Sequence, residues 1–179
     1  MKTWQQFLQE KKNTNYDFSS TQVNLPHALA NKIIKWGKVH IPDNELHELG
    51  REDEIHATVL YGIHDSEPDA VKKLLKSIQP INIKLGKISL FSDDEYDVIK
   101  IDVRSPDLHK LNAKLRDSLK YTSSHPIYKP HVTIAYVKKG RGKKYDGLDP
   151  FDNNSIKINQ IIFSSKDGTK TTISLFQRK

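Results

Sequence analysis

Two pairs of histidine and threonine stand in the same local sequence at two places in the chain. The stretch His-Ala-Thr-Val-Leu-Tyr at residues 56–61 recurs as His-Val-Thr-Ile-Ala-Tyr at residues 131–136. In a β-strand, residues two apart share a face, so His56 and Thr58 would project together, as would His131 and Thr133. Imidazole titrates near neutral pH and can give or take a proton, while a hydroxyl can stabilise developing negative charge.

Strict alternation also predicts which residues of the two strands are buried. Residues of the opposite face would pack into the core: Ala57, Val59 and Tyr61 in the first strand, and Val132, Ile134 and Tyr136 in the second, with Ala135 on the face of His131. With 8 histidines in 179 residues, two His-x-Thr pairs alone could arise by chance. The tyrosine five residues after each histidine makes coincidence a poor explanation. The alternative is that both histidines are ordinary half-buried strand residues.

This set of four residues suits the cleavage of a phosphodiester. Attack by an adjacent 2′-hydroxyl, or by water on a 2′,3′-cyclic phosphate, requires a proton to be removed on one side of phosphorus and delivered on the other. Two opposed histidines can do both without a metal ion, and Thr58 and Thr133 would donate hydrogen bonds to the non-bridging oxygens. A zinc site made by both histidines and Glu54 is a competing interpretation, although no His-Glu-x-x-His motif is present.

Composition limits the function further. The chain contains 36% hydrophobic and 28% charged residues and no cysteine, so disulfides, thiol catalysis and cysteine-bound zinc are excluded. No apolar run approaches the roughly 20 residues that span a bilayer, and residues 1–12 do not resemble a signal peptide. We therefore expect a cytoplasmic protein of one domain, covering residues 1–179, with no membrane association, no cofactor and no obligate protein partner.

The formal net charge of +7 is concentrated in the second half of the chain and points to an anionic ligand. The densest positive stretch follows the second His-x-Thr segment, and we name it the basic loop: Lys138, Lys139, Arg141, Lys143 and Lys144. Aromatic side chains that could stack on a nucleobase are Tyr16, Phe18, Trp36 and Tyr145, of which Tyr145 is expected to be the most exposed because of its charged surroundings.

Periodicity predicts an α+β fold. Helices are expected over residues 3–12, 26–36, 66–78 and 105–119, and strands over residues 54–61, 81–90, 96–103, 131–137, 156–164 and 171–176, whereas residues 39–53 resemble a loop. The two motif strands lie 75 residues apart, each with its own helix. This order predicts two similar lobes, related by a pseudo-twofold axis, with antiparallel sheets around a central cleft and helices packed outside.

The paired His-x-Thr strands and the Tyr128-Lys129-Pro130 stretch before His131 resemble the 2H phosphoesterase superfamily over most of residues 54–176. The resemblance implies a bilobal α+β cleft, metal-independent activity on cyclic or 2′-hydroxyl-adjacent phosphodiesters, and a catalytic tetrad of His56, Thr58, His131 and Thr133. Residues 17–26, 41–43 and 50–52 are similar to the phage-encoded anti-CBASS members. This narrower likeness implies that the substrate is a cyclic oligonucleotide messenger of bacterial immunity. It also implies that the protein acts in the cytoplasm of the host cell.

Two alternatives stay open at this point. The first is an enzyme acting on RNA ends, such as an RNA 2′,3′-cyclic phosphodiesterase, which the basic second half would equally suit. The second is a module that binds nucleotides or RNA without catalysis. A binding module has no need of two titrating histidines on matched strands, so the tetrad argues for an enzyme.

Overall fold

The computed structural model describes residues 16–123, 127–152 and 154–176. The strands are β1 (Ser19–Asn24), β2 (Leu46–Arg51), β3 (His56–Ile63), β4 (Ile81–Ser92), β5 (Tyr96–Arg104), β6 (His131–Lys138), β7 (Ser155–Ile158), β8 (Gln160–Ser164) and β9 (Lys170–Ser174). The helices are α2 (His27–His40), α3 (Asp69–Leu75) and α4 (Pro106–Ser118), with short 3-10 turns η1 (Asp43–Glu45) and η2 (Lys143–Tyr145). The expected helix over residues 3–12 lies outside the described residues.

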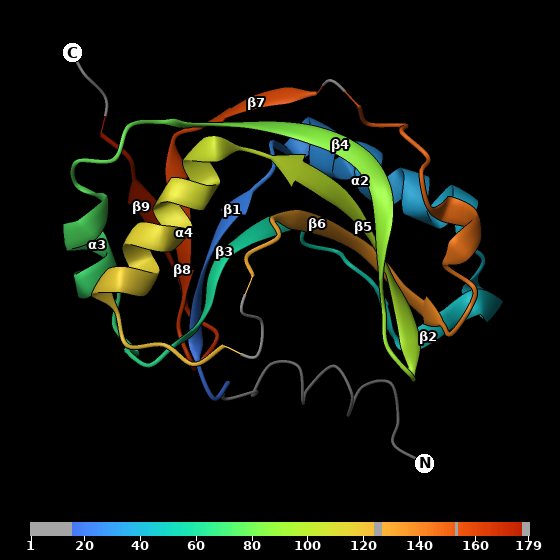
Figure 1. The fold of residues 1–179 in the computed structure, drawn as a ribbon, viewed down its shortest axis with the longest axis horizontal. Helices are drawn as coiled ribbons and strands as arrows, with labels where there is room; N and C mark the ends of the chain where they lie inside the picture. The colour runs from blue at the N-terminus through green and yellow to red at the C-terminus, as the bar shows by residue number, and fades with distance from the viewer. Residues whose placement is uncertain (1–15, 124–126, 153, 177–179) are drawn as a thin grey trace.

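All of these strands belong to one antiparallel sheet in the order β7-β4-β5-β6-β3-β1-β8-β9, with β2 attached to β6. Figure 1 shows the sheet curled into an arch, with β3 and β6 side by side near its middle. β3 and β6 are paired at Ala57 and Val132. Further along the same edge of β6, β2 takes the place of β3 and pairs with Val137 and Ala135. The sheet therefore has two halves that meet at the two motif strands, and the expected bilobal α+β fold is confirmed.

The helices pack against the face of the sheet that is opposite the histidines. In α2, a Cβ added to Gly37 would lie 3.1 Å from the Ile134 side chain, so glycine lets this helix approach β6 closely. α4 begins at Ser105, whose hydroxyl accepts a hydrogen bond from the Leu108 amide, and buries Leu108, Leu111 and Leu115 along one stripe. We call this surface of the sheet the helix face, and the other surface the tetrad face.

Two segments differ from the sequence prediction. Residues 46–51, expected to be part of a loop, form β2, because the edge of β6 beyond β3 supplies hydrogen-bonding partners that periodicity does not reveal. The expected strand over residues 156–164 is two strands: β7 pairs with β4, whereas β8 pairs with β1 and β9. A single residue, Asn159, separates β7 from β8, so the chain crosses there from one half of the sheet to the other. The hairpin of β8 and β9 around Gly168 was predicted correctly.

Candidate active site

The register of the two central strands brings the tetrad together. Ala57 pairs with Val132 in antiparallel register. One step along each strand, this register sets His56 opposite Thr133 and Thr58 opposite His131, and residues directly opposite one another lie on one face with Cβ atoms about 5 Å apart. Each histidine therefore faces the threonine of the other motif, which is the arrangement that a twofold relation between the lobes requires.

Both motif strands carry a β-bulge immediately after the threonine, and this corrects the predicted alternation. In β3, Thr58 and Leu60 pair with successive residues of β1, which leaves Val59 as the extra residue. In β6, Thr133 and Ala135 pair with successive residues of β5, which leaves Ile134 as the extra residue. The carbonyl oxygens at the two bulges accept hydrogen bonds from Asn112 Nδ2 (2.7 Å) and from the amide of Glu52 (2.9 Å), respectively.

The bulges reverse the faces of the residues that follow. Leu60 and Ala135 are buried in the helix face, although strict alternation assigned Ala135 to the face of His131. Tyr61 and Tyr136 lie on the tetrad face, and Tyr61 is 54% exposed. The prediction that both tyrosines are core residues is therefore wrong, because one extra residue shifts the two-residue period.

Backbone carbonyls hold both imidazoles in the same tautomer. His56 Nδ1 lies 2.8 Å from the carbonyl oxygen of Glu54, and His131 Nδ1 lies 2.7 Å from that of Lys129. A carbonyl oxygen can only accept a hydrogen bond, so each Nδ1 carries a proton and each Nε2 is left for chemistry. The same contact from residue i to residue i−2 occurs in both motifs, and it gives both rings the same orientation relative to their strands.

The neighbours of His131 and Thr133 on β5 are charged. Asp102 pairs with His131 and Lys100 with Thr133. Lys100 is 4% exposed, donates to Asp102 Oδ1 at 2.7 Å, and lies 4.2 Å from the centre of the Phe91 ring. The Phe91 ring also meets His131 edge-on at 4.9 Å. Burial, together with the nearby Lys100 ammonium, lowers the pKa of His131 despite the hydrogen bond to Lys129 and the negative charge of Asp102.

The neighbours of His56 and Thr58 on β1 are uncharged amides. Asn24 pairs with His56 and Gln22 with Thr58, and both side chains donate to Glu54 Oε1. Lys170 forms an ion pair with Glu54 Oε2. Burial alone would raise the pKa of Glu54, but the hydrogen bonds from Lys170 and Asn24 hold it below its ordinary value. Glu54 therefore holds His56 through its backbone carbonyl, while its carboxylate is hydrogen-bonded to Gln22 and Asn24 and paired with Lys170.

Two further tyrosines connect the motifs to their surroundings. The buried Tyr128 hydroxyl donates to the carbonyl oxygen of Thr58 at 2.9 Å, so the stretch before β6 is fixed to β3. Tyr136 lies near Glu52 and Thr133, and burial together with the Glu52 carboxylate raises the pKa of Tyr136 to about 12. Tyr136 thus stays protonated at physiological pH, and it lies on the same face of β6 as Thr133.

Among the aromatic candidates, Trp36 and Tyr145 lie away from the tetrad. Trp36 belongs to α2, on the helix face, and packs against Tyr145 and Phe151 with edge-on ring contacts at 6.1 and 5.9 Å. Tyr145 is 4% exposed and its hydroxyl donates to the carbonyl oxygen of His40 at 2.8 Å. The expectation that Tyr145 is exposed is wrong, because an aromatic ring within a charged stretch is still drawn into an adjacent apolar cluster.

Phe18 and Tyr16 precede β1. Phe18 lies next to Tyr61, with ring centres 6.2 Å apart. Tyr16 is half exposed and its amide donates to the carbonyl oxygen of Lys166 in the turn between β8 and β9. The structure therefore brings Phe18 to the end of a motif strand and leaves Tyr16 beside the hairpin turn.

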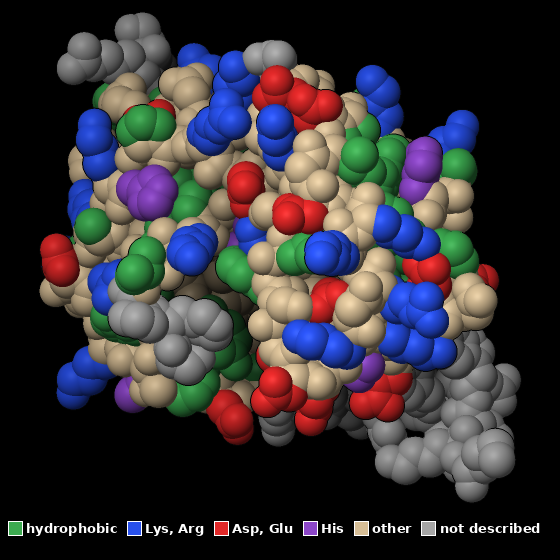
Figure 2. Space-filling model, turned by 45° about the vertical axis from the view of Figure 1, so that its right-hand side comes forward, with side chains coloured by type: hydrophobic (Ala, Val, Ile, Leu, Met, Phe, Trp, Pro, Cys, Tyr) green, Lys and Arg blue, Asp and Glu red, His purple; other side chains and the backbone are tan. Residues whose placement is uncertain are grey.

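The basic loop follows the far end of β6, roughly 20 Å along the strand from His131. Three of its cations already have protein partners: Lys138 donates to the carbonyl oxygen of Asn44, Lys139 to Ser92 Oγ, and Lys144 pairs with Glu45 at 2.7 Å. Arg141 and Lys143 are exposed and, with Lys144 and Glu45, line a shallow hollow of about 340 Å³. On the face shown in Figure 2, positive and negative side chains are interspersed, and no unbroken basic patch forms.

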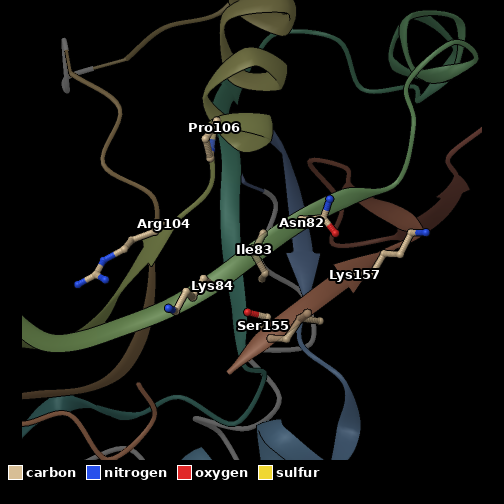
Figure 3. A pocket seen from close by; sticks show the side chains of 8 residues that line it. Asn82, Ile83, Lys84, Arg104, Pro106, Ser155 and Lys157 are labelled. Atoms are coloured by element: carbon tan, nitrogen blue, oxygen red, sulfur yellow. The ribbon is translucent and has the colours of Figure 1, made fainter. Parts of the chain in front are cut away.

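A second hollow of about 380 Å³ lies between β4, β7 and the start of α4, and none of the tetrad lines it. In Figure 3 the side chains of Lys84, Arg104 and Lys157 extend from its rim in different directions and do not converge on a common point. Within the described residues, no group of three or more histidines and carboxylates is placed to hold a metal ion. The described helices also include none that is long and apolar enough to cross a bilayer.

The polar neighbours of the tetrad were missed at the level of sequence, although a signal was present. Gln22-x-Asn24 and Lys100-x-Asp102 are polar pairs with the same two-residue spacing as His-x-Thr, the first in the mostly polar β1 and the second in the largely apolar β5. A polar pair on the buried strands beside a motif strand indicates a shared functional face.

Comparison with known proteins agrees with this geometry. A family model described as the 2′-5′ RNA ligase superfamily, whose members are 2H phosphoesterases, matches residues 30–145, which is more than half of the chain. The chain belongs to this superfamily. A comparison with curated protein sequences gave no significant match.

Solved structures share the fold at low sequence identity. The protein TT0787 of Thermus thermophilus aligns with a TM-score of 0.61 and 14% identity over 88% of this chain and 97% of its own. Escherichia coli LigT complexed with 3′-AMP has a TM-score of 0.61 and 18% identity, covering 91% of this chain and 96% of its own. Kluyveromyces marxianus Usb1 with uridine monophosphate has a TM-score of 0.53 and 8% identity, covering 90% and 99%.

Proposed function

We propose that the protein is a phosphodiesterase that uses His56 and His131 as an acid–base pair and opens 3′,5′-linked cyclic di- or trinucleotides. The observation that carries the proposal is the juxtaposition of two imidazoles and two hydroxyls on adjacent strands, with both Nδ1 atoms tied to carbonyls and both Nε2 atoms left for proton transfer. The substrate class rests on the resemblance of residues 17–26, 41–43 and 50–52 to anti-CBASS phosphodiesterases, which counter a bacterial immune signal.

The surroundings of the two histidines differ, and this difference supports a division of roles between them. Burial and Lys100 lower the pKa of His131, so this imidazole is neutral near pH 7 and suited to be the base. In the proposed reaction His131 Nε2 takes the proton of the 2′-hydroxyl as its oxygen bonds to phosphorus. His56 Nε2 gives a proton to the 5′-oxygen as the bond between that oxygen and phosphorus breaks. Thr58 and Thr133 donate hydrogen bonds to the non-bridging oxygens.

The test is incubation with cyclic dinucleotides, cyclic trinucleotides and nucleoside 2′,3′-cyclic phosphates, each with and without EDTA, followed by chromatography. We expect cyclic oligonucleotides to be cleaved to products that carry a 2′,3′-cyclic or terminal phosphate. We also expect EDTA to leave the rate unchanged, because the four side chains supply acid, base and hydrogen-bond donors. A rate that is lost on chelation and restored by zinc would overturn the metal-free mechanism.

An enzyme that acts on RNA ends is the second candidate, and the fold match to LigT with 3′-AMP and to Usb1 with uridine monophosphate supports it. Cleavage of 2′,3′-cyclic phosphates or RNA ends, with no cleavage of cyclic oligonucleotides, would establish it in place of the first. Binding of either class without turnover between pH 5 and 9 would instead identify a nucleotide- or RNA-binding module.

A further inference from the structure

A group of three aromatic rings lies at the end of β3, on the tetrad face. Phe18 stacks on His64 with ring centres 5.4 Å apart and an interplanar angle of 26°, and Tyr61 meets Phe18 edge-on at 6.2 Å. We call these residues the aromatic cluster. Tyr61 is 54% exposed and His64 is exposed, while Phe18 is half-buried beneath them. His64 is held in place by a hydrogen bond of 2.8 Å between its Nε2 and Thr122 Oγ1.

The exposure of Tyr61 is not a by-product of core packing. Because of the bulge at Val59, Leu60 lies on the helix face, where it is 5% exposed, and Tyr61 lies on the face of His56 and Thr58. A large ring that is left in water at the end of an active-site strand gains little for stability, since most of its apolar area stays hydrated. A ligand that covers the ring would bury this apolar area and gain binding free energy from it.

The matching tyrosine of the other half is placed differently. Tyr136 is half-buried near Glu52 and Thr133, and its ring packs edge-on against Tyr96 at 5.7 Å. Of the two motif tyrosines, Tyr61 is therefore the one that offers an open ring, and it lies beyond Thr58 on β3.

The position of the cluster relates it to one side of the scissile phosphate. Tyr61 lies three residues after Thr58, roughly 7–10 Å along the strand once the bulge is counted. This distance suits the reach from a phosphate to the base of the same nucleotide. Thr58 faces His131 across the central pair of strands, so the aromatic cluster lies on the His131 side of the tetrad and away from His56.

We infer that the aromatic cluster is a subsite that stacks the nucleobase of the nucleotide whose ribose supplies the attacking 2′-hydroxyl. This assignment rests on the proposed function, in which His131 removes the proton of that hydroxyl. The nucleotide that leaves with the 5′-oxygen lies toward His56 and the half-buried Tyr136. Stacking uses the ring face that every base shares, so the subsite selects for the presence of a base more than for its identity.

The experiment measures how tightly the full chain binds two isomers. Adenosine 3′-monophosphate represents the nucleotide whose ribose supplies the attacking 2′-hydroxyl. Adenosine 5′-monophosphate represents the nucleotide that leaves with the 5′-oxygen. We expect Tyr61→Ala to weaken binding of the 3′-isomer by about 5- to 150-fold, and Tyr61→Phe to bind it nearly as well as the parent protein. Phe18→Ala should weaken it less. The affinity for the 5′-isomer should change little in all three variants.

A matched control is Val39→Ala, which truncates an exposed apolar side chain on α2, on the other side of the sheet. It should leave both affinities unchanged. Unaltered binding of the 3′-isomer by Tyr61→Ala would overturn the subsite. So would a loss confined to the 5′-isomer, or an equal loss for both isomers accompanied by a lower Tm. The measurement needs no turnover, so a protein that binds as expected but cleaves no phosphodiester would retain the subsite and lose the proposed function.

Discussion

The two halves of the tetrad have the same backbone geometry, but the side chains on their neighbouring strands differ in charge. In both, the threonine is followed by a bulge, and the Nδ1 atom of the histidine is tied to the carbonyl oxygen two residues earlier. Beside His131 stand the charged Lys100 and Asp102, whereas beside His56 stand the amides Gln22 and Asn24. Repeated geometry supplies two equivalent imidazoles, and the neighbouring strands then place charged side chains beside His131 and amides beside His56.

The largest effects are expected from the histidines themselves. His56→Ala and His131→Ala should each reduce kcat by about 10²-fold or more, and the double variant should be little worse, because the pair acts as a unit. Because one histidine must be protonated and the other neutral, the pH–rate profile of the parent protein should be bell-shaped, with both limbs between roughly pH 5 and 8.

A substrate with sulfur in place of the bridging 5′-oxygen separates the two roles, since its leaving group needs no proton. It should restore turnover to His56→Ala and not to His131→Ala. The reverse pattern would exchange the roles assigned to the two halves. Rescue of neither variant would show that opposed acid–base catalysis is wrong.

The threonines and tyrosines give the next effect. Thr133→Ala should reduce kcat by about 10²-fold through loss of a donor to the phosphoryl oxygens. Tyr136→Phe removes a hydroxyl that lies near Glu52 and Thr133 and should reduce kcat by about 2- to 10-fold, the effect of losing one polar contact beside Thr133. Tyr61→Phe is the matched control in the other half and should leave kcat unchanged. Equal effects of Tyr136→Phe and Tyr61→Phe on kcat would contradict the different roles given to the two tyrosines.

Charge changes next to His131 should move one limb of the pH profile in opposite directions. Lys100 lowers and Asp102 raises the pKa of His131, so Lys100→Met should raise it and Asp102→Asn should lower it. A base is active when neutral, so the acidic limb of kcat/KM should move to higher pH in Lys100→Met and to lower pH in Asp102→Asn. Changing Asn24→Asp beside His56 should leave this limb in place, and a Tm measurement should accompany each variant because Lys100 is buried.

The smallest effect is expected in the basic loop. Neutralising Arg141 and Lys143, which are exposed, should raise KM a few-fold at low salt and flatten its salt dependence, with kcat unchanged. Neutralising Lys138 and Lys139, which are bonded to Asn44 and Ser92, should raise KM less. A KM that is insensitive to all four changes at low salt would leave the loop as a solvated connection.

The sequence predicted features that depend on local periodicity. The two-residue spacing of His-x-Thr was enough to put each pair on one face, and the leucine stripe of α4 followed from helical spacing. The bulges at Val59 and Ile134 were not predictable in this way, because each depends on which residues the neighbouring strand offers as partners. One inserted residue in each strand was enough to put its tyrosine on the tetrad face and not in the core.

Features that depend on pairing or packing with residues distant in sequence were also not predictable. β2 forms because β3 leaves part of the β6 edge unpaired, and Tyr145 is buried because Trp36, far away in sequence, packs against it and against Phe151 in an apolar cluster. Lys100 beside His131 follows from the pairing of β5 with β6, which no local pattern fixes. Local spacing thus placed the candidate reactive groups on one face, and tertiary pairing determined what surrounds them.

The crossing of the chain at Asn159 has a consequence for how the enzyme meets its substrate. Because β7 and β8 are joined through one residue yet belong to opposite halves of the sheet, the halves are tethered there as well as at β3 and β6. We expect these two connections to restrict movement of the two halves relative to each other. Nucleotide binding should accordingly proceed in one kinetic phase in a stopped-flow experiment, and a slower second phase that saturates with ligand concentration would reveal a closing motion instead.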